Sequence, residues 1–516
     1  MVTVAYPPPT RTSLYRADVP DVPIQIWSRM LERLRRNASV IIVLLAMILI
    51  ESVALRAHTL GVVLIAAIAG IALIIVLFRA SISSIAVAAA YACAFTLTWN
   101  GWFLGPVRPG DLLILLTVLL ILVADPNDGF RTPPWWVKQL PIAILLVALI
   151  TIYFPPDPVY LSNRLVLTAQ GKPTVDTKSS LAVANLGVAF KFIVAVFATP
   201  MAFIGAARID HRAARRLGVA FGAGAALSGW AATVDHFLHT NVGKLITRLP
   251  NVGSRQFGFA NHPNFLAAGT VLGIPFAYWL LCSTKRNERL LGLICLPGLL
   301  GGVYASGSRG GAVCAVAVVG LCVVLHPRTR PYTPQIALAG IVATGIFAGV
   351  VPSIGTAILK ATRLSGGLAT QGSDTVRGLV GAQGWRDWHH SPWHGIGLQA
   401  SFDASQVYLQ ELASGGLILF IAMQVYMAGG IFTAWRYMKR NDMAVALLGS
   451  LIAVLALNYF EADLTDRFYY VPVAILVAMV HVLETEDDTG EPPRRDPGFL
   501  RADGLPSRVP ARARGG

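Results

Sequence analysis

The sequence predicts an all-α fold, a polytopic bundle of helices embedded in a membrane. Of the 516 residues, 55% are hydrophobic and 13% are charged, and the mean hydropathy is +0.60. A water-soluble domain of this length does not carry such a composition. Apolar runs long enough to cross a bilayer recur along the chain. The 48 glycines are typical of membrane helices, because small residues let helix backbones approach closely.

The charge distribution and the cysteines argue against a nucleic-acid-binding protein, a disulfide framework and a metal site. The net charge of +15 is divided among short basic clusters between the apolar runs, so it indicates membrane topology and we expect no nucleic-acid partner. The cysteines fall inside predicted spans without metal-ligand spacing, so we expect free thiols rather than a disulfide framework or a metal site. They are Cys93, Cys282, Cys295, Cys314 and Cys322.

The first 37 residues form a cytoplasmic segment in this interpretation. Residues 1–23 are polar and Pro-rich, which predicts disorder, and they contain no cleavable signal peptide. Within Ile24–Asn37, apolar and basic side chains occupy opposite faces at helical spacing. This favours an amphipathic helix lying on the membrane, or alternatively an ordinary basic run before the first span. The Pro/Arg-rich end, 484–516, predicts a disordered cytoplasmic tail.

The transmembrane domain extends over 38–483, with about fourteen predicted helices, although twelve is also possible. The predicted spans are 38–55, 59–78, 81–104, 109–124, 137–154, 181–207, 216–238, 259–282, 289–305, 309–326, 335–352, 406–434, 443–463 and 467–483. With the N-terminus inside, every strongly basic short loop falls on one side. The positive-inside rule therefore places both termini in the cytoplasm.

This topology leaves three longer segments on the outer face, 155–180, 239–258 and 353–405. The third is a long extracytoplasmic loop, and loops of this length are more often functional than idle. It contains three tryptophans within nine positions: Trp385, Trp388 and Trp393. They suit either anchoring at the membrane interface or a platform on which sugar rings stack.

Two arginines face the outer leaflet in this topology. Arg255 lies in GSRQFGFANHPN, and Arg309 lies in the tight turn YASGSRGG. A guanidinium makes bidentate bonds to phosphate and stays charged in a poorly hydrated cleft, while the neighbouring glycines expose backbone N–H groups. The alternative for Arg255 is a helix-end cation that snorkels to the interface, and for Arg309 a turn residue that anchors two helices.

These motifs resemble those of the bacterial O-antigen ligase and O-antigen polymerase family. RQFGFANHPNFLA is similar to its R-x-x-G-x-x-x-x-P-N signature, with Arg255, Gly258, Pro263 and Asn264 in the matching places. SGSRGG resembles its second arginine motif. A third similarity is to the family's run R…W…P-x-x-G-x-G…H-N-x-Y-L-Q…G-x-x-G-L. It is carried by Arg377, Trp388, SPWHGIG and YLQELASGGLILF. The resemblance extends over about 250–420, in the family's order.

The resemblance implies a GT-C-like, metal-independent, inverting glycosyltransferase without a cofactor, which assembles cell-surface polysaccharide at the bacterial inner membrane. Its donor would be a polyprenyl-diphosphate-linked glycan and its acceptor a glycan or a lipid. Arg255 and Arg309 would bind and neutralise the diphosphate leaving group while an acceptor hydroxyl attacks the anomeric carbon from the opposite face. The further substrate-binding residues that the resemblance implies are His262, Asn264, Arg377, Trp388 and Tyr408.

One departure from the family pattern concerns the acceptor. Where the family has His-Asn before Y-L-Q, this chain has Ser405 and Gln406, and a serine is no base near neutral pH. Asp403 and His394 are the first candidates to replace the missing imidazole, followed by the neighbouring histidines of the same loop. His262, near Arg255, is a candidate to orient the phosphate instead.

Three functions stay open on the sequence alone. A polymerase and a ligase share the donor and differ only in the acceptor. A lipid-linked oligosaccharide flippase would also need many spans, but it should carry charges deep within them. Such residues are few: Lys191, Asp235, Glu411 and Glu461. The missing histidine keeps open a catalytically inactive, structural family member.

Overall fold

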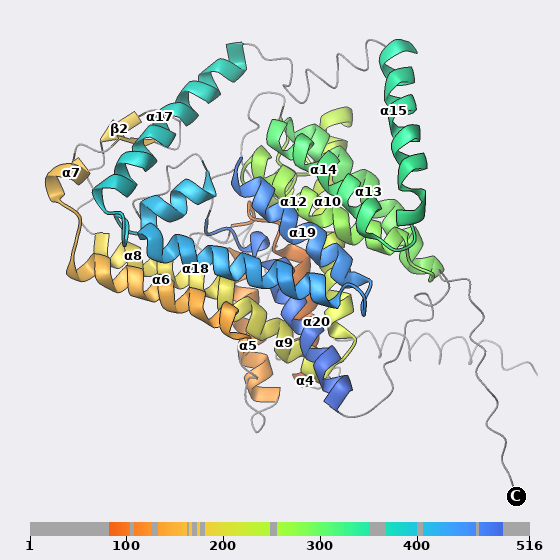
Figure 1. Cartoon of the computed structure of the whole chain (residues 1–516), viewed down its shortest axis with the longest axis horizontal. Helices are drawn as coiled ribbons and strands as arrows, with labels where there is room; N and C mark the ends of the chain where they lie inside the picture. The colour runs from red at the N-terminus through yellow and green to blue at the C-terminus, as the bar shows by residue number, and fades with distance from the viewer. Residues whose placement is uncertain are drawn as a thin grey trace, which may run out of the picture.

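The computed structural model describes residues 82–103, 108–124, 133–162, 165–167, 173–175, 181–247, 255–350, 368–399, 406–460 and 464–488. Within them the predicted all-helical class is confirmed (Figure 1), apart from one short antiparallel hairpin of β1 (Leu165–Leu167) and β2 (Pro173–Val175). The spans predicted at 38–55 and 59–78 and the amphipathic helix at Ile24–Asn37 lie outside the described residues.

Every predicted span from residue 81 onwards coincides with an observed helix. The helices are α4 (Ile82–Thr96), α5 (Pro109–Ala124), α6 (Trp135–Tyr153), α7 (Pro158–Ser162), α8 (Leu181–Ile193), α9 (Thr199–Ile209), α10 (Ala213–Leu238), α11 (Lys244–Thr247), α12 (Pro263–Leu281), α13 (Arg286–Ser306), α14 (Arg309–Leu325), α15 (Thr333–Val350), α17 (Leu368–His390), α18 (Val407–Tyr437), α19 (Met443–Asn458) and α20 (Val471–Asp488). A π-helical turn, η1 (Val194–Ala198), joins α8 to α9, and 3₁₀ turns η2 (Arg330–Tyr332) and η3 (Arg467–Tyr469) precede α15 and α20.

Among the described residues, 7 helices are long and apolar enough to cross a membrane, or up to 8 if the bent pair of α14 and α15 is one span. That pair bends by 112°, and α15 stands apart from α13 and α14 at the right of Figure 1. Helices α4, α5 and α19 are apolar but shorter. The predicted number of fourteen spans therefore stays a prediction.

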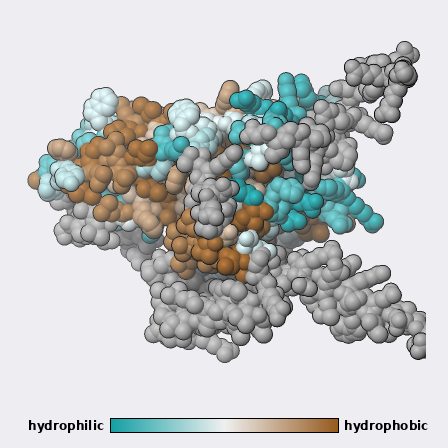
Figure 2. All heavy atoms as spheres, turned by 90° about the horizontal axis from the view of Figure 1, so that it is seen from below, coloured by the Kyte–Doolittle hydropathy of each residue, from teal (hydrophilic) through white to brown (hydrophobic). Residues whose placement is uncertain are grey.

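Close helix crossings hold the centre of the bundle together. A Cβ added to Gly229 of α10 would lie 2.2 Å from the carbonyl oxygen of Gly298 in α13. A Cβ on Gly224 would lie 1.8 Å from the carbonyl oxygen of Phe95 in α4. Helices α4, α10 and α13 can therefore approach this closely only because glycine stands at the crossings, as expected for packing inside a membrane. Figure 2 shows broad apolar patches on the outside of the bundle.

The outer segment 353–405 was predicted only as a long loop, and part of it is the 23-residue helix α17. Helix α17 lies beside α7 and the hairpin at the upper left of Figure 1. Its sequence has no apolar stripe and several glycines, which explains why periodicity did not predict it. At the C-terminus, α20 continues through Asp488, so the first residues of the predicted tail, which begins at 484, are helical.

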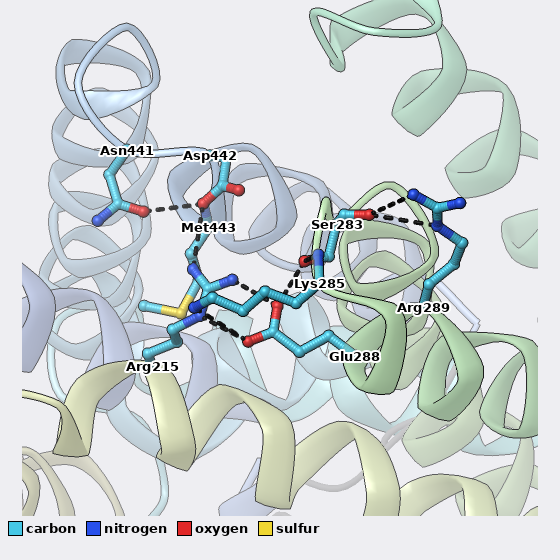
Figure 3. Close-up of polar contacts among 8 residues, drawn as sticks. All are labelled: Arg215, Ser283, Lys285, Glu288, Arg289, Asn441, Asp442 and Met443. Carbon is cyan, nitrogen blue, oxygen red and sulfur yellow. Dashed lines mark hydrogen bonds and ion pairs between the residues drawn. The ribbon is translucent and has the colours of Figure 1, made fainter. Parts of the chain in front are cut away.

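Three of the basic connections that we predict to share one side meet at one end of the bundle (Figure 3). Arg215, at the start of α10, lies 2.7 Å from Glu288 of α13 and 3.6 Å from Asp442, which precedes α19. Ser283, after α12, donates a 2.5 Å hydrogen bond to Glu288. One polar network therefore ties three inter-helix connections together, and we refer to this end as the basic end.

Candidate functional site

The candidate site lies at the opposite end, where α13 finishes and both α12 and α14 begin. Arg255 precedes the loop into α12, and its Nε donates a 2.7 Å hydrogen bond to the carbonyl oxygen of Ser306, the last residue of α13. Its Nη2 donates to the side-chain oxygen of Asn264 in the first turn of α12. The half-buried guanidinium of Arg255 thus bridges two helix ends.

Arg309 lies three residues beyond Ser306, at the first position of α14. Gly307 ends α13 in the left-handed region (φ +58°), and the Oγ of Ser308 caps α14 by accepting from the N–H of Gly311 at 3.2 Å. The two arginine motifs therefore meet at this turn, because Arg255 bonds to the last residue of α13 and Arg309 begins α14. A diphosphate site shared by the two guanidinium groups stays a prediction. The guanidinium of Arg309 also forms an ion pair with Asp374 of α17, with 2.5 Å between Nη2 and Oδ1.

Gly258 of the first motif shapes the loop rather than contacting a ligand. Its φ is +54°, and an added Cβ would lie 2.4 Å from the carbonyl oxygen of Ser228 in α10. The next residue, Phe259, donates its N–H to the Oγ of Ser228 at 3.0 Å and accepts from the N–H of Gly101 at 3.0 Å. The loop that carries Arg255 is thereby seated on α10 and on the turn after α4.

His262 is the N-cap of α12, and its Nδ1 accepts the N–H of Asn264 at 3.2 Å. Burial, together with the smaller effects of the charges of Arg255 and Arg377, lowers the pKa of His262 to about 4. The imidazole is therefore neutral near pH 7, and with Nδ1 accepting, the proton is on Nε2. In this arrangement the Nε2–H of His262 is a hydrogen-bond donor, and its role in orienting a phosphate stays a prediction.

Of the predicted site residues, five gather at this end: Arg255, His262, Asn264, Arg309 and Arg377. Asn264 receives Arg255, so it positions that guanidinium. Arg377 lies three residues after Asp374 in α17, and its charge acts on His262 in the same direction as that of Arg255. Helices α12 and α14 both direct their N-termini here, so their dipoles add to a positive potential suited to an anion.

Three other predicted residues have different surroundings. The hydroxyl of Tyr408 donates to the carbonyl oxygen of Leu455 in α19 at 2.8 Å, which commits it to helix packing. Trp388 is half-buried, packs against Trp385 and His389, and its buried indole N–H has no partner in the described part of the chain. The Oγ of Ser391 lies 3.3 Å from the Nδ1 of His394. Asp403 lies outside the described residues.

The third family-like motif builds a clamp, residues 391–399, around a break in α18. Gly416 interrupts α18 with φ +60° and ψ −156°. The first N–H groups after the break are satisfied: Leu417 donates to the carbonyl oxygen of Pro392 and Ile418 to that of Trp393, at 2.9 and 3.2 Å. In return the N–H groups of Ile396 and Gly397 bond to the carbonyls of Ala413 and Ser414, at 2.9 and 3.1 Å. The motif thereby fixes His394 beside the break in α18.

Sequence reasoning missed a buried polar network behind the site. Asp466, which is fully buried, accepts from Asn100 at 2.6 Å and from Arg108 at 2.5 Å. The side-chain oxygen of Asn100 in turn accepts the N–H of Asn261, beside His262, at 3.0 Å. The available signal was the pair of charged residues at the start of the last span, Asp466 and Arg467, where an unpaired charge would be costly. Asp374 was also overlooked as a partner of Arg309.

The charged residues that would favour transport occupy other places. Asp235 accepts from Thr240 and from the N–H groups of Val242 and Gly243, at 2.6 to 2.7 Å, so it closes the loop after α10. Lys191 is exposed on α8. Glu411 is fully buried and bonded to Gln424 at 3.0 Å. Within the described residues, no group of three His, Cys, Asp or Glu is placed to hold a metal ion.

Comparison with known proteins confirms the resemblance. A family model described as O-antigen ligase matches residues 291–423. The matched stretch begins in α13 and ends in α18, so it includes Arg309, α17 and the clamp at 391–399, while Arg255 lies upstream of it. A search among curated proteins found no match.

Proposed function

We propose that this O-antigen-ligase-like chain is a glycosyltransferase of the ligase or polymerase type. It transfers a glycan from a polyprenyl-diphosphate donor to an acceptor hydroxyl at the outer face of the bacterial cytoplasmic membrane, for cell-surface polysaccharide assembly. The observation that carries the proposal is the bond from Arg255 to Ser306, because it joins the two arginine motifs at one end of the bundle. By the positive-inside rule, the basic end is cytoplasmic and the arginine end faces outward.

The arginines supply what the reaction needs at its leaving group. When the glycosidic bond to the diphosphate breaks, negative charge grows on the phosphate oxygens. Arg255 and Arg309, supported by Arg377 and by the N-termini of α12 and α14, supply positive charge at one end of the bundle where this anion would form. A preorganised donor of this kind contributes about 10²- to 10³-fold in rate. Because these cations neutralise the diphosphate, the proposed route is metal-independent and needs no cofactor.

His262 completes the donor site as a neutral donor. Its Nδ1 is occupied by the N–H of Asn264, so Nε2–H is the group that points its hydrogen bond elsewhere, and a diphosphate oxygen is the proposed acceptor. A base for the attacking hydroxyl must come from another residue. Asp403 and His394 remain the candidates, since both belong to the outer segment that leads into α18.

The two alternatives have less support. A flippase requires charge along a central path, and Asp235 and Lys191 do not provide it, because one closes a loop and the other is exposed. An inactive structural member gives no account of why Arg255 and Arg309, from two family-like motifs, meet at one end of the bundle.

The test compares Arg255→Ala and Arg309→Ala with Arg286→Ala. Arg286 is an exposed arginine at the basic end of α13, the far end of the helix that finishes at Ser306. We expect both site variants to insert normally and lose glycan transfer while the control keeps it. Unchanged glycan ladders from either site variant would remove the mechanism.

In a deletion strain, accumulated single lipid-linked repeats identify a polymerase, whereas long lipid-linked chains identify a ligase.

A further inference from the structure

The ion pair between Arg309 and Asp374 puts a carboxylate on a guanidinium that the proposed function assigns to phosphate. The Nη2 to Oδ1 distance is 2.5 Å, and the side chains are 32% and 51% exposed. Arg309 also stands at the N-terminus of the 17-residue helix α14, where a negative charge is favoured. The carboxylate and a phosphate present the same chemistry to an arginine fork, namely paired anionic oxygens.

We propose that Asp374 is a displaceable counter-ion of the donor site: it holds Arg309 in the absence of donor and gives way to the diphosphate, which releases the first half of α17. The inference rests on the proposed function for the identity of the anion. Under this proposal donor binding is coupled to a movement of α17. The position of α17 therefore depends on whether the donor site is occupied.

The two halves of α17 are held in different ways. Its second half is anchored by Asp387, which is buried and accepts from Tyr160 of α7 at 2.7 Å and from Gln383 at 2.8 Å. His390 stacks on the same tyrosine with ring centroids 3.9 Å apart. The first half carries the solvent-exposed ion pair between Asp374 and Arg309.

A glycine lies between the two halves. A Cβ added to Gly378 would meet no heavy atom within 4 Å, so no packing contact requires glycine there. A glycine inside a helix lowers helix stability relative to alanine. Exposed pairs are worth little, typically less than about fivefold in an equilibrium. An ion pair as weak as that between Arg309 and Asp374 is one that a binding anion can break.

The experiment uses the full chain in detergent or nanodiscs and inorganic pyrophosphate as the probe. We expect Asp374→Asn to bind pyrophosphate about three- to fivefold more tightly than the wild type, because a competing charge is gone. Asp374→Glu, which keeps the charge, should bind like the wild type. The matched control is Asp487→Asn: Asp487 pairs with Arg440 at 2.8 Å at the basic end, with side chains 56% and 50% exposed, and its loss should change nothing.

Hydrogen exchange gives a second readout that does not depend on a variant. Pyrophosphate should speed amide exchange in α17 up to about Gly378 and leave the segment around Asp387 unchanged. The proposal is overturned if Asp374→Asn binds pyrophosphate equally or more weakly, or if pyrophosphate slows exchange in the first half of α17. If Asp374→Asn does not fold, exchange in the wild-type protein decides. Release of α17 without any glycan transfer by the protein would contradict the proposed function and leave the counter-ion role standing.

Discussion

The Nε of Arg255 donates a 2.7 Å hydrogen bond to the carbonyl oxygen of Ser306, although 51 positions separate the two residues in the chain. Because Ser306 ends α13 and Arg309 begins α14, this bond unites two motifs that sequence alone presents as separate. The backbone supports the same pairing, since the N–H of Gln256 donates to the carbonyl oxygen of Ala305 at 3.0 Å. The segment that carries Arg255 is thus bonded to the end of α13 without a ligand.

Arg255→Lys should lose glycan transfer almost as completely as Arg255→Ala. The guanidinium reaches Ser306 with Nε and Asn264 with Nη2, and a lysine ammonium cannot keep both bonds while facing a phosphate. We expect the rate of transfer to fall about 10²- to 10³-fold, measured with purified protein and lipid-linked donor. Arg286→Lys, at the far end of α13, is the control. Full activity of Arg255→Lys would show that charge alone suffices and that the fork geometry has no role.

His262 should make stability depend on pH in a defined window. Its pKa in the folded protein is about 4, below the ordinary value of 6.5. The unfolded chain therefore takes up a proton between pH 6.5 and 4 that the folded protein refuses, so stability is complete above about 6.5 and falls as the pH decreases. The loss between pH 6.5 and 5 is on the order of 2 kcal/mol.

The measurement for His262 is the thermal midpoint of the wild type and of His262→Asn at pH 7 and pH 5. Asparagine is a good N-cap and does not titrate, so we expect the variant to lose less stability on acidification. Equal losses in both proteins would assign the pH dependence to other groups.

Hydropathy located the helices of the bundle because a membrane span requires a long apolar run, whatever its neighbours are. It did not locate α17, whose helicity depends on tertiary contacts such as Asp387 with Tyr160. Arg255 and Arg309 were recognisable from residue type and glycine context. Their partner Asp374 was not, because nothing in the sequence specifies which face of a polar segment turns toward the end of α13.

The structural role of the clamp at 391–399 was also not predictable from the sequence. SPWHGIG was recognised as a family-like pattern, but its work at Gly416 depends on hydrogen bonds between backbone groups, which no side-chain pattern encodes. The left-handed φ of Gly395 and Gly397, +66° and +107°, explains why glycines stand there. The role of His394 as a base stays a prediction, since the clamp fixes its position without supplying a substrate contact.

Gly416→Ala should destabilise the protein by about 3 kcal/mol or more. An alanine would be strained at φ +60°, and its Cβ would lie 2.3 Å from the carbonyl carbon of Trp393. The control is Gly320→Ala in α14, where a Cβ meets no heavy atom within 4 Å and helix propensity predicts a gain of about 0.5 to 1 kcal/mol. Thermal unfolding in detergent compares the two. A variant at Gly416 as stable as that at Gly320 would mean that the break in α18 is not required.

Asp466→Ala should be strongly destabilising, by about 3 to 5 kcal/mol, because it removes a fully buried carboxylate that accepts hydrogen bonds from Arg108 and Asn100. Since Asn100 holds the N–H of Asn261 beside His262, we also expect a raised KM for donor in whatever protein folds. Asp487→Ala, which removes an exposed pair, should cost less than about 1 kcal/mol. Similar unfolding midpoints for the two variants would show that the network behind the site carries little energy.

The orientation of the bundle can be tested with single cysteines at its two ends. Arg386 is exposed on α17, and Lys439 is exposed after α18 in the loop at the basic end. If the basic end is cytoplasmic, an impermeant maleimide should label Arg386→Cys in intact spheroplasts, and label Lys439→Cys only after permeabilisation. Four of the five native cysteines are buried and Cys282 is half-buried, so background labelling should be low. The reverse pattern would place Arg255 and Arg309 in the cytoplasm, where a donor glycan awaiting transfer on the outer leaflet is out of reach, and the proposed function would fail with the topology.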